Sequence, residues 1–275
     1  MIKVIPLLEN TKENPECRKK HGLSLYIETP KHKILFDLGP NDLFIKNAIK
    51  LGVKIEETDT VIISHGHIDH CGGLGAFLKH NSTAKIYLRP QALDKHYVKF
   101  LGIPFYAGIN KNLVNGERFV FTNDFEVIDD ELSLFSGVRG THPLPSADKN
   151  LFVKKGGRII FDDFSHEQNL IIDADGRKTL FCGCSHAGIV NIVDKALQVC
   201  GSAPQTVVGG FHLFEPTTKR YEKTEYITAV TNELKKYDAD FYTCHCTGVK
   251  AYDLMKKQGL KLDYLHTGTV CELYK

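Results

Sequence analysis

The pattern of apolar and polar positions divides the chain into strands and helices along its whole length. Runs rich in Val, Ile, Leu and Phe predict strands over residues 2–8, 23–28, 33–37, 60–64, 85–88, 118–127, 132–136, 169–173, 179–183, 206–208, 241–244 and 264–267. Helical spacing of the apolar residues predicts helices over 41–51, 73–80, 189–199, 221–236 and 249–258. Strand-rich segments followed by mixed strands and helices predict an α/β fold with two layers of sheet and helices outside them.

Length and composition narrow the class of protein. A chain of 275 residues fits one large domain or two small ones, and 42% apolar residues can bury a large core. The net charge of +2 gives no support for a general nucleic-acid or membrane partner. The start of the chain lacks the features of a secretory signal, and no apolar run approaches a membrane span. We therefore expect a cytoplasmic protein whose eight cysteines are reduced.

The segment Ser64–His70, SHGHIDH, concentrates metal-binding side chains directly after the apolar run Val61–Ile63. Its three histidines and one aspartate supply the nitrogen and oxygen donors that zinc, iron and manganese accept. Gly66 allows a sharp bend of the backbone within the segment. Four donors at one strand end are too many for a single tetrahedral ion if others join from elsewhere, so the crowding predicts two metals side by side.

An ordered series of further motifs accompanies this segment along most of the chain. They are HGLS at 21–24, ILFDLG at 34–39, GCSHAGIVN at 183–191, GGFHL at 209–213 and HCTG at 245–248. Together they resemble the metallo-β-lactamase superfamily, whose pattern is His-x-His-x-Asp-His, and within it the 7,8-dihydropterin-6-methyl-4-(β-D-ribofuranosyl)aminobenzene-5'-phosphate synthase-like branch. The resemblance implies a single domain over 1–275 with a four-layer αβ/βα sandwich, in which two mixed sheets are flanked by helices and hold the metals at one edge.

The resemblance also implies how the metal ligands divide. In the superfamily pattern one metal takes His65, His67 and His186, and the other takes Asp69, His70 and His245. We expect two divalent ions, with zinc favoured and iron or manganese left open. A metal-activated hydroxide then acts as the nucleophile, because a metal lowers the pKa of bound water towards neutrality. Asp69 is expected to be catalytic as well as a ligand.

His212 marks a departure from the superfamily, many of whose members carry a bridging aspartate at the equivalent strand end. This chain has Gly209-Gly210-Phe211-His212 there, and the next carboxylate is Glu215. His212 is either an extra ligand or a catalytic group that faces the substrate. We favour the second interpretation, because an imidazole at this place can donate to an oxyanion or a phosphate.

Two acidic positions outside the metal motifs leave alternatives open. Asp37 ends a strand and either holds a ligand histidine by a hydrogen bond or caps a turn. The segment 162–167, DDFSHE, either lines the site or forms a solvated acidic loop.

The substrate side is less defined. Residues 137–150 predict a long loop, in which Arg139 and His142 either grip a phosphate or carboxylate or belong to a solvated connector. We expect a lid or insertion region around 90–150. Its aromatic residues, Tyr97, Phe100, Phe105 and Tyr106, form a wall for a ring-bearing substrate, a core or a dimer contact. The sequence therefore does not decide whether the protein forms a homodimer.

Two cysteine pairs flank the histidine motifs, at Cys182-x-Cys184 and Cys244-x-Cys246. One alternative is a separate structural zinc held by the four thiols, although such sites prefer wider spacing within each pair. The alternative that we favour is that they are small buried residues beside the metal site.

The sequence therefore predicts a dinuclear metal-dependent hydrolase, or a related transferase, of a small phosphorylated or ester-type metabolite. The alternatives are the pterin-condensing synthase of the branch name, a phosphodiesterase or nuclease, and a non-catalytic metal-binding protein. Near-neutral charge without a basic stripe argues against a nucleic-acid substrate. His67 stands where oxygen-reducing di-iron members of the superfamily usually carry glutamate. The sequence alone names neither the substrate nor the native metal.

Overall fold

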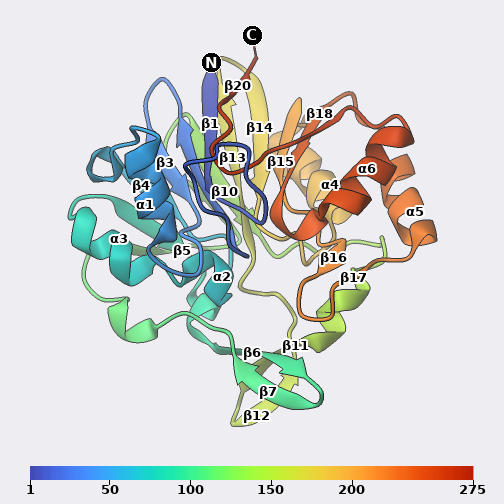
Figure 1. The fold of residues 1–275 in the computed structure, drawn as a ribbon, viewed down its shortest axis with the longest axis horizontal. Coiled ribbons are helices and arrows are strands. Elements are labelled where there is room, and N and C mark those ends of the chain that lie inside the picture. The colour runs from blue at the N-terminus through green and yellow to red at the C-terminus, as the bar shows by residue number, and fades with distance from the viewer. Residues whose placement is uncertain (275) are drawn as a thin grey trace.

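The computed structural model describes residues 1–274 and contains two seven-stranded sheets that face each other (Figure 1). The first sheet has the order β20-β1-β2-β3-β4-β5-β8. Its strands are β1 (Ile2–Leu8), β2 (Ser24–Glu28), β3 (Lys33–Phe36), β4 (Thr60–Ile62), β5 (Lys85–Leu88), β8 (Phe119–Phe121) and β20 (Cys271–Leu273). Strands β3, β4, β5 and β8 are parallel, whereas β20, β1 and β2 pair antiparallel.

The second sheet has the order β19-β18-β15-β14-β13-β10-β9 and is also mixed. Its strands are β9 (Phe125–Val127), β10 (Leu132–Ser136), β13 (Gln168–Ala174), β14 (Arg177–Cys182), β15 (Thr206–Gly209), β18 (Asp240–Thr243) and β19 (Leu262–Tyr264). The parallel set β14-β15-β18-β19 matters for the site, because neighbouring parallel strands end at the same edge of a sheet.

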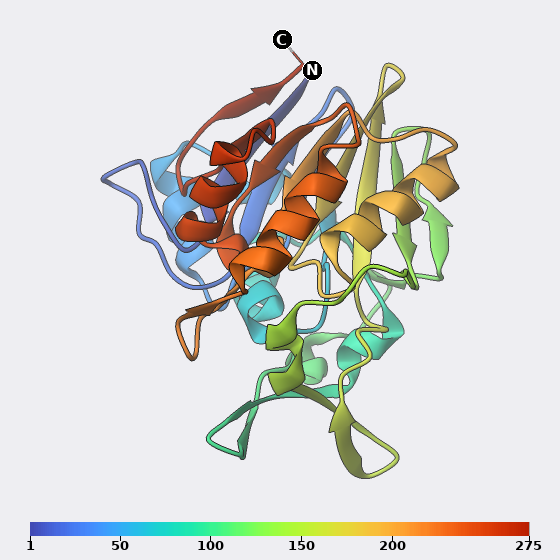
Figure 2. The same cartoon turned by 90° about the vertical axis from the view of Figure 1, so that its right-hand side faces the viewer.

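Helices cover the outer face of each sheet (Figures 1 and 2). Helices α1 (Leu43–Lys50) and α3 (Leu74–His80) lie against the first sheet, and the short α2 (Ile68–Cys71) lies at its edge. Helices α4 (Ile189–Cys200), α5 (Thr224–Leu234) and α6 (Val249–Lys257) lie against the second. Three buried clusters fill the spaces between the layers: one under α1 and α3, one between the sheets and one under α4–α6. This is the four-layer sandwich that the resemblance implies.

A smaller sheet lies beyond one edge of the sandwich, at the bottom of Figure 1. Its order is β12-β11-β6-β7, with β6 (Lys95–Phe100), β7 (Ile103–Tyr106), β11 (Leu151–Lys155) and β12 (Arg158–Phe161). A two-stranded ribbon, β16 (Phe214–Glu215) with β17 (Arg220–Tyr221), completes the strands. The small sheet therefore includes residues outside the region around 90–150. That this region forms a lid or insertion stays a prediction.

The elements of the sandwich follow the sequence pattern closely. The strands at 2–8, 85–88 and 132–136 have the predicted bounds, and the predicted strand at 118–127 is divided into β8 and β9. The apolar pattern did not predict the small sheet. The residues of β7 and β12 are exposed, so these strands do not show the alternation of apolar and polar residues that a strand with one buried face shows. Within residues 1–274, no helix has the length and apolar character that crossing a membrane requires.

Candidate metal centre

The histidine motifs meet at one edge of the sandwich because each follows a strand. Strand β4 leads to the motif at 64–70, and the parallel strands β14, β15 and β18 lead to His186, His212 and His245. Asp37, Ser185, His212 and His245 have φ values of 62°, 62°, 50° and 50°, a region that non-glycine residues seldom adopt. Such strained backbone concentrates at functional sites, where surrounding contacts hold it.

His65, His67 and His186 form the first donor set. Their rings lie 4.7 Å (His65–His67), 5.0 Å (His65–His186) and 4.9 Å (His67–His186) apart between centroids. His65 Nδ1 lies 2.8 Å from Ser64 Oγ, whose own hydrogen goes to Asp37 Oδ2 at 2.6 Å. His65 must therefore donate through Nδ1, which leaves the lone pair on Nε2 for a metal.

The other two rings of the first donor set contact carboxylates. His186 Nδ1 donates to Asp148 Oδ1 at 2.8 Å, and His67 Nε2 lies 3.9 Å from Asp162 Oδ2. Across the described chain, the Nε2 atoms of all three rings are buried and lack a hydrogen-bond partner. Buried imidazole nitrogens without partners fit metal binding, because leaving them unsatisfied is costly. The donor atoms of His65 and His186 lie within 4.8 Å of each other, whereas that of His67 lies within the same distance of donors of His96, Asp162 and His166.

Asp69, His70 and His245 form the second donor set. The two Nε2 atoms lie 3.1 Å apart, and Asp69 Oδ2 lies 3.6 Å from His70 Nε2 and 3.4 Å from His245 Nε2. His70 Nδ1 donates to Asp37 at 2.6 Å. His245 Nδ1 donates to Asn10 Oδ1 at 3.1 Å; the Asn10 amide is oriented by its own donation to the His245 carbonyl.

These contacts leave both Nε2 lone pairs and one carboxylate oxygen facing a common point, an arrangement that needs a cation. Burial lowers the pKa of His70, but Asp37 and Asp69 outweigh it and raise that pKa to about 9. Burial likewise opposes ionisation of Asp69, yet His70, His21 and His245 hold its pKa well below the usual range. The electrostatics therefore favour positive charge at the centre of the second donor set. The donors fit a divalent metal in each set.

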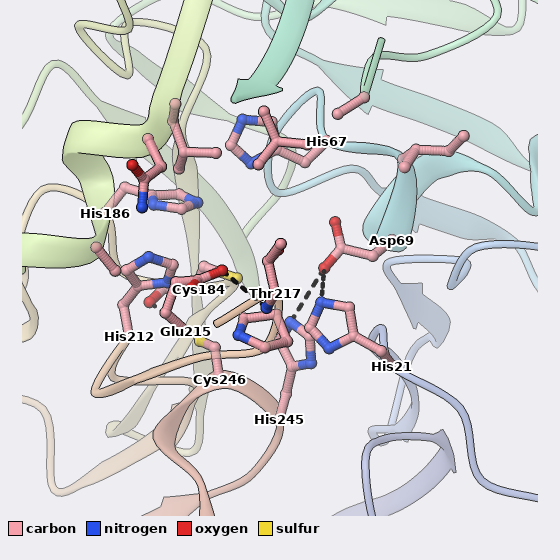
Figure 3. A pocket seen from close by; sticks show the side chains of 17 residues that line it. His21, His67, Asp69, Cys184, His186, His212, Glu215, Thr217, His245 and Cys246 are labelled. Carbon is pink, nitrogen blue, oxygen red and sulfur yellow. Dashed lines mark hydrogen bonds and ion pairs between the residues drawn. The ribbon is translucent and has the colours of Figure 1, made fainter. Parts of the chain in front are cut away.

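Other residues reach the centre that the sequence analysis did not single out. His21 Nε2 lies 3.1 Å from Asp69 Oδ2, and its ring stacks on that of His245 at 4.8 Å (Figure 3). His21 is the first residue of the HGLS motif, so the sequence did contain a signal for His21. Asp148, in the short 3-10 helix Ser146–Asn150, lies in the predicted loop and carried no such signal.

The 162–167 segment packs behind the donors through its buried residues Asp162, His166 and Glu167, while Asp163 is exposed. Asp162 Oδ2 accepts from His96 Nδ1 at 2.8 Å and lies 3.3 Å from His166 Nε2. Burial opposes its charge, but these imidazoles and His67 hold the pKa of Asp162 well below its usual range. His166 Nδ1 accepts from the Gly66 backbone N–H at 2.9 Å, which ties the segment to the histidine motif. Glu167 accepts from the backbone N–H groups of His186 and Ala187.

His212 lies at the wall of the pocket beside the first donor set (Figure 3). Its ring is 4.3 Å from that of His186, and its Nε2 lies 3.3 Å from Asp148 Oδ1. Burial lowers the pKa of His212, but Asp148 and Cys246 outweigh it and raise that pKa to about 9. The ring is placed to donate a proton or a hydrogen bond into the pocket, and its catalytic role stays a prediction.

The four motif cysteines do not form one thiol site. Cys182 packs in the cluster under α4–α6, whereas Cys244 packs in the cluster between the sheets. Cys184 and Cys246 instead line the pocket with the histidines. The separate structural zinc therefore finds no support, and the cysteines are buried beside the metal centre.

Arg139 and His142 are not brought to the centre. The His142 backbone N–H donates to Asn191, its ring lies 3.4 Å from Asp194 on α4, and neither residue lines the pocket that holds the donor sets. Their substrate role stays a prediction that no contact in the described chain supports.

The centre opens into a pocket of about 340 Å³ (Figure 3). Four of the six proposed donors line it, and apolar walls come from Ile68, Val98, Ala107, Leu151 and Pro216. Val98 and Leu151 belong to the small sheet, so this sheet borders the pocket. Three of the four aromatic residues considered for a wall, Phe100, Phe105 and Tyr106, are instead exposed on that sheet.

Comparisons with known proteins show similarity of sequence and fold over the whole chain. The chain is 29% identical to the 7,8-dihydropterin-6-methyl-4-(beta-D-ribofuranosyl)-aminobenzene-5'-phosphate synthase of Methanocaldococcus jannaschii, over 98% of this chain and 96% of that protein. The crystal structure of Tm1679, a metal-dependent hydrolase of the beta-lactamase superfamily, matches at a TM-score of 0.85 and 28% identity over 100% of both chains.

A more distant structure shares the fold alone. Zn²⁺-bound PqqB from Methylobacterium extorquens matches at a TM-score of 0.58 and 11% identity, over 98% of this chain and 100% of that one. The family model of the metallo-beta-lactamase superfamily matches residues 18–189, more than half of the chain. The chain therefore belongs to the metallo-β-lactamase superfamily.

Proposed function

We propose that the protein is a dinuclear metal-dependent hydrolase of a small metabolite with an ester or phosphoryl group. The observation that carries the proposal is that donors of both sets, His67 and His186 of the first and Asp69 and His245 of the second, line one pocket. His65, His67 and His186 would hold one divalent ion, and Asp69, His70 and His245 the other. Bound metals would supply a water of lowered pKa and positive charge for the leaving oxygen.

The residues around the donor sets hold and orient the reacting groups. Asp37 and Asn10 fix the orientation of His70 and His245, and Asp148 fixes that of His186. Asp69 has the only carboxylate among the ligands, and its side chain keeps 20% exposure, so it can accept a hydrogen bond from a water in the pocket. His212, on the opposite wall, can donate to an oxygen that gains negative charge.

The pocket lining supports a small, largely apolar substrate with one reactive polar end. Apolar side chains form the walls, and none of the described lining residues is Lys or Arg. Negative charge on a substrate would therefore be neutralised at the metal centre and by imidazoles. Among the described lining residues there is also no Lys or Arg to hold the phosphates of a nucleic acid in this pocket.

A second candidate is the condensing reaction that names the relative from Methanocaldococcus jannaschii, which is similar over nearly the full length of both chains. In that reaction a pterin alcohol pyrophosphate joins an aminobenzene ribofuranoside phosphate and releases pyrophosphate. The same donor sets would then bind the departing pyrophosphate instead of preparing water for attack.

One assay separates the two candidates. The purified chain, loaded with Zn²⁺ or Mn²⁺, is incubated with a panel of phosphate esters, carboxylic esters and lactones. In a separate reaction it is incubated with the pterin alcohol pyrophosphate and the aminobenzene ribofuranoside phosphate. We expect hydrolysis of at least one panel compound. The matched pair is His67→Ala, which removes a donor, and His80→Ala, which changes an exposed histidine on α3. Metal binding without hydrolysis, together with pyrophosphate release from the pterin substrates, would favour the synthase.

A further inference from the structure

The place of the bridging carboxylate is closed in this chain. At the end of β15 the backbone of Gly209 and Gly210 runs directly against the neighbouring strand and loops. A Cβ at Gly210 would fall 2.5 Å from Cys246 Sγ and 3.0 Å from the Gly183 carbonyl oxygen. Real Cβ atoms do not approach other atoms that closely. No carboxylate can therefore extend from Gly210 towards the metals without displacing this sulfur.

The sulfur of Cys184 lies at the place where a bridging ligand is needed. It is within 4.8 Å of the metal-binding nitrogens of His65 and His186 in the first donor set. It is also within 4.8 Å of those of His70 and His245 in the second donor set, with His70 Nε2 at 3.1 Å. Figure 3 shows Cys184 between His186 on one side of the pocket and His245 on the other.

These distances suit coordination and not only packing. A zinc bound to sulfur at about 2.3 Å and to imidazole at about 2.0–2.1 Å places the two donors roughly 3.6 Å apart in tetrahedral geometry. Small side-chain movements would bring the surrounding nitrogens to that separation. Cys184 is 3% exposed, so its sulfur is held among these donors and is not free to turn into solvent.

We propose that Cys184 is a metal ligand whose thiolate bridges the two ions in place of the missing carboxylate. Coordination releases the thiol proton to solvent and leaves one sulfur anion shared between both metals. The proposal rests on the metal-binding part of the proposed function and not on the identity of the substrate. It predicts a metal preference as well, because thiolate favours zinc, cobalt and ferrous iron over magnesium and manganese.

Cobalt substitution tests the proposal without any assay of activity. The full chain is freed of metal with a chelator and titrated with Co²⁺ while the absorption spectrum is recorded. A sulfur–cobalt bond gives an intense near-ultraviolet charge-transfer band, which imidazole and carboxylate ligands do not give. We expect this band to grow with both equivalents of Co²⁺ taken up. X-ray absorption of the zinc-loaded chain should show sulfur at about 2.3 Å.

Three variants locate the sulfur. Cys184→Ser should abolish the band and weaken metal binding at both sites by more than about tenfold. A tenfold loss is already typical when a residue that only hydrogen-bonds to a ligand is removed, and loss of a ligand itself should cost more. Cys184→Asp, which supplies a carboxylate, should regain two-metal binding without the band. Cys246→Ser is the matched control, since it removes the neighbouring thiol, and it should keep the band. If Cys184→Ser fails to fold, the spectra of the wild-type chain and of Cys246→Ser still test whether a thiolate other than that of Cys246 binds the metals.

The outcomes separate this proposal from the proposed function. Uptake of two Co²⁺ ions without the band, or a band that disappears in Cys246→Ser, would overturn the role of Cys184 and leave the hydrolase proposal standing. A loss of affinity at one site only in Cys184→Ser would overturn the bridge. A chain that takes up no metal would overturn both proposals. Two metals with a Cys184-dependent band, but no hydrolysis, would support the bridge and count against the hydrolase.

Discussion

The two donor sets lie at the same edge of the sandwich, yet different parts of the chain support them. The first donor set has three neutral imidazoles, and the carboxylates beside it come from Asp148 and Asp162, which flank strands of the small sheet. The second donor set includes a carboxylate of its own, and Asp37 and Asn10 orient its imidazoles from the N-terminal part of the sandwich. A metal held by the first donor set would thus depend in part on residues beside the small sheet, although Asp37 also supports His65 through Ser64. A metal held by the second donor set would depend on the sandwich.

At this one edge, the two donor sets therefore differ in whether the residues that support them also border the pocket. In the second donor set, the residues that orient the imidazoles, Asp37 and Asn10, belong to the sandwich and do not line the pocket. Ligands oriented from a segment that also borders the pocket are coupled to substrate contacts, because Ala147, Asn150 and Leu151 line the same cavity. The outer partners of a metal site control its affinity, so each donor set should respond to changes in its own support.

The largest expected effect comes from removing a ligand of either set. His67→Ala should lose the first metal and reduce activity to background, because water at the site is then no longer prepared for attack. Asp69→Asn should also abolish activity, with little change in folding. Metal analysis by mass spectrometry and turnover of a panel substrate provide the two readouts. Normal turnover in either variant would mean that the site lies elsewhere.

His212→Ala should leave both metals bound but slow turnover by about a hundredfold or more, as loss of an oxyanion-type donor typically does. The reason is that His212 contacts Asp148 and His186 but is not needed to complete either donor set. Metal content and turnover are measured on the same sample. Loss of one metal equivalent would make His212 a ligand, and unchanged values for both would make it structural.

The comparison itself is tested by a pair of matched substitutions in the supporting carboxylates. Asp37→Asn should weaken the second metal by about 10–100-fold, and Asp148→Asn should weaken the first by a similar factor. Asp148→Asn should leave the second metal nearly unchanged, whereas Asp37→Asn should also weaken the first by a smaller factor, because Asp37 supports His65 through the Ser64 hydroxyl. Isothermal titration with Zn²⁺ resolves the two sites. Equal losses at both sites in both variants would show that the sets are not supported separately.

The smallest effects should come from Arg139→Ala and His142→Ala. Neither residue lines the pocket, and His142 lies by Asp194 on α4. We expect metal affinity and turnover within about twofold of the parent chain, in keeping with surface changes that cost little. A large rise in KM for either variant would show that the 137–150 loop moves over the pocket when substrate binds.

The sequence by itself predicted two layers of sheet with helices outside, and the resemblance carried by its motifs implied the four-layer sandwich and the two groups of proposed ligands. Buried strands and amphipathic helices have periods that a single sequence displays, so most bounds fell within a few residues of the structure. The motif SHGHIDH supplied four donors because they are adjacent along the chain. His186 and His245 followed from motifs at other strand ends, which parallel pairing brings to one edge.

Only the tertiary structure decided which residues support those ligands. Asp148 reaches the centre from the 137–150 loop and His96 from β6, and no spacing along the chain marks these contacts. For the 162–167 segment the sequence left open whether it lines the site, and only the folded chain places Asp162 against His96 and His67. The sequence showed Cys184 two residues before His186 but gave no reason to place its sulfur between the two donor sets. That position results from how β14, β15 and β18 pack at their ends, where Gly209 and Gly210 leave no room for another side chain. Local pattern fixes periodic elements and adjacent donors, whereas contacts between distant segments depend on packing that only the folded chain defines.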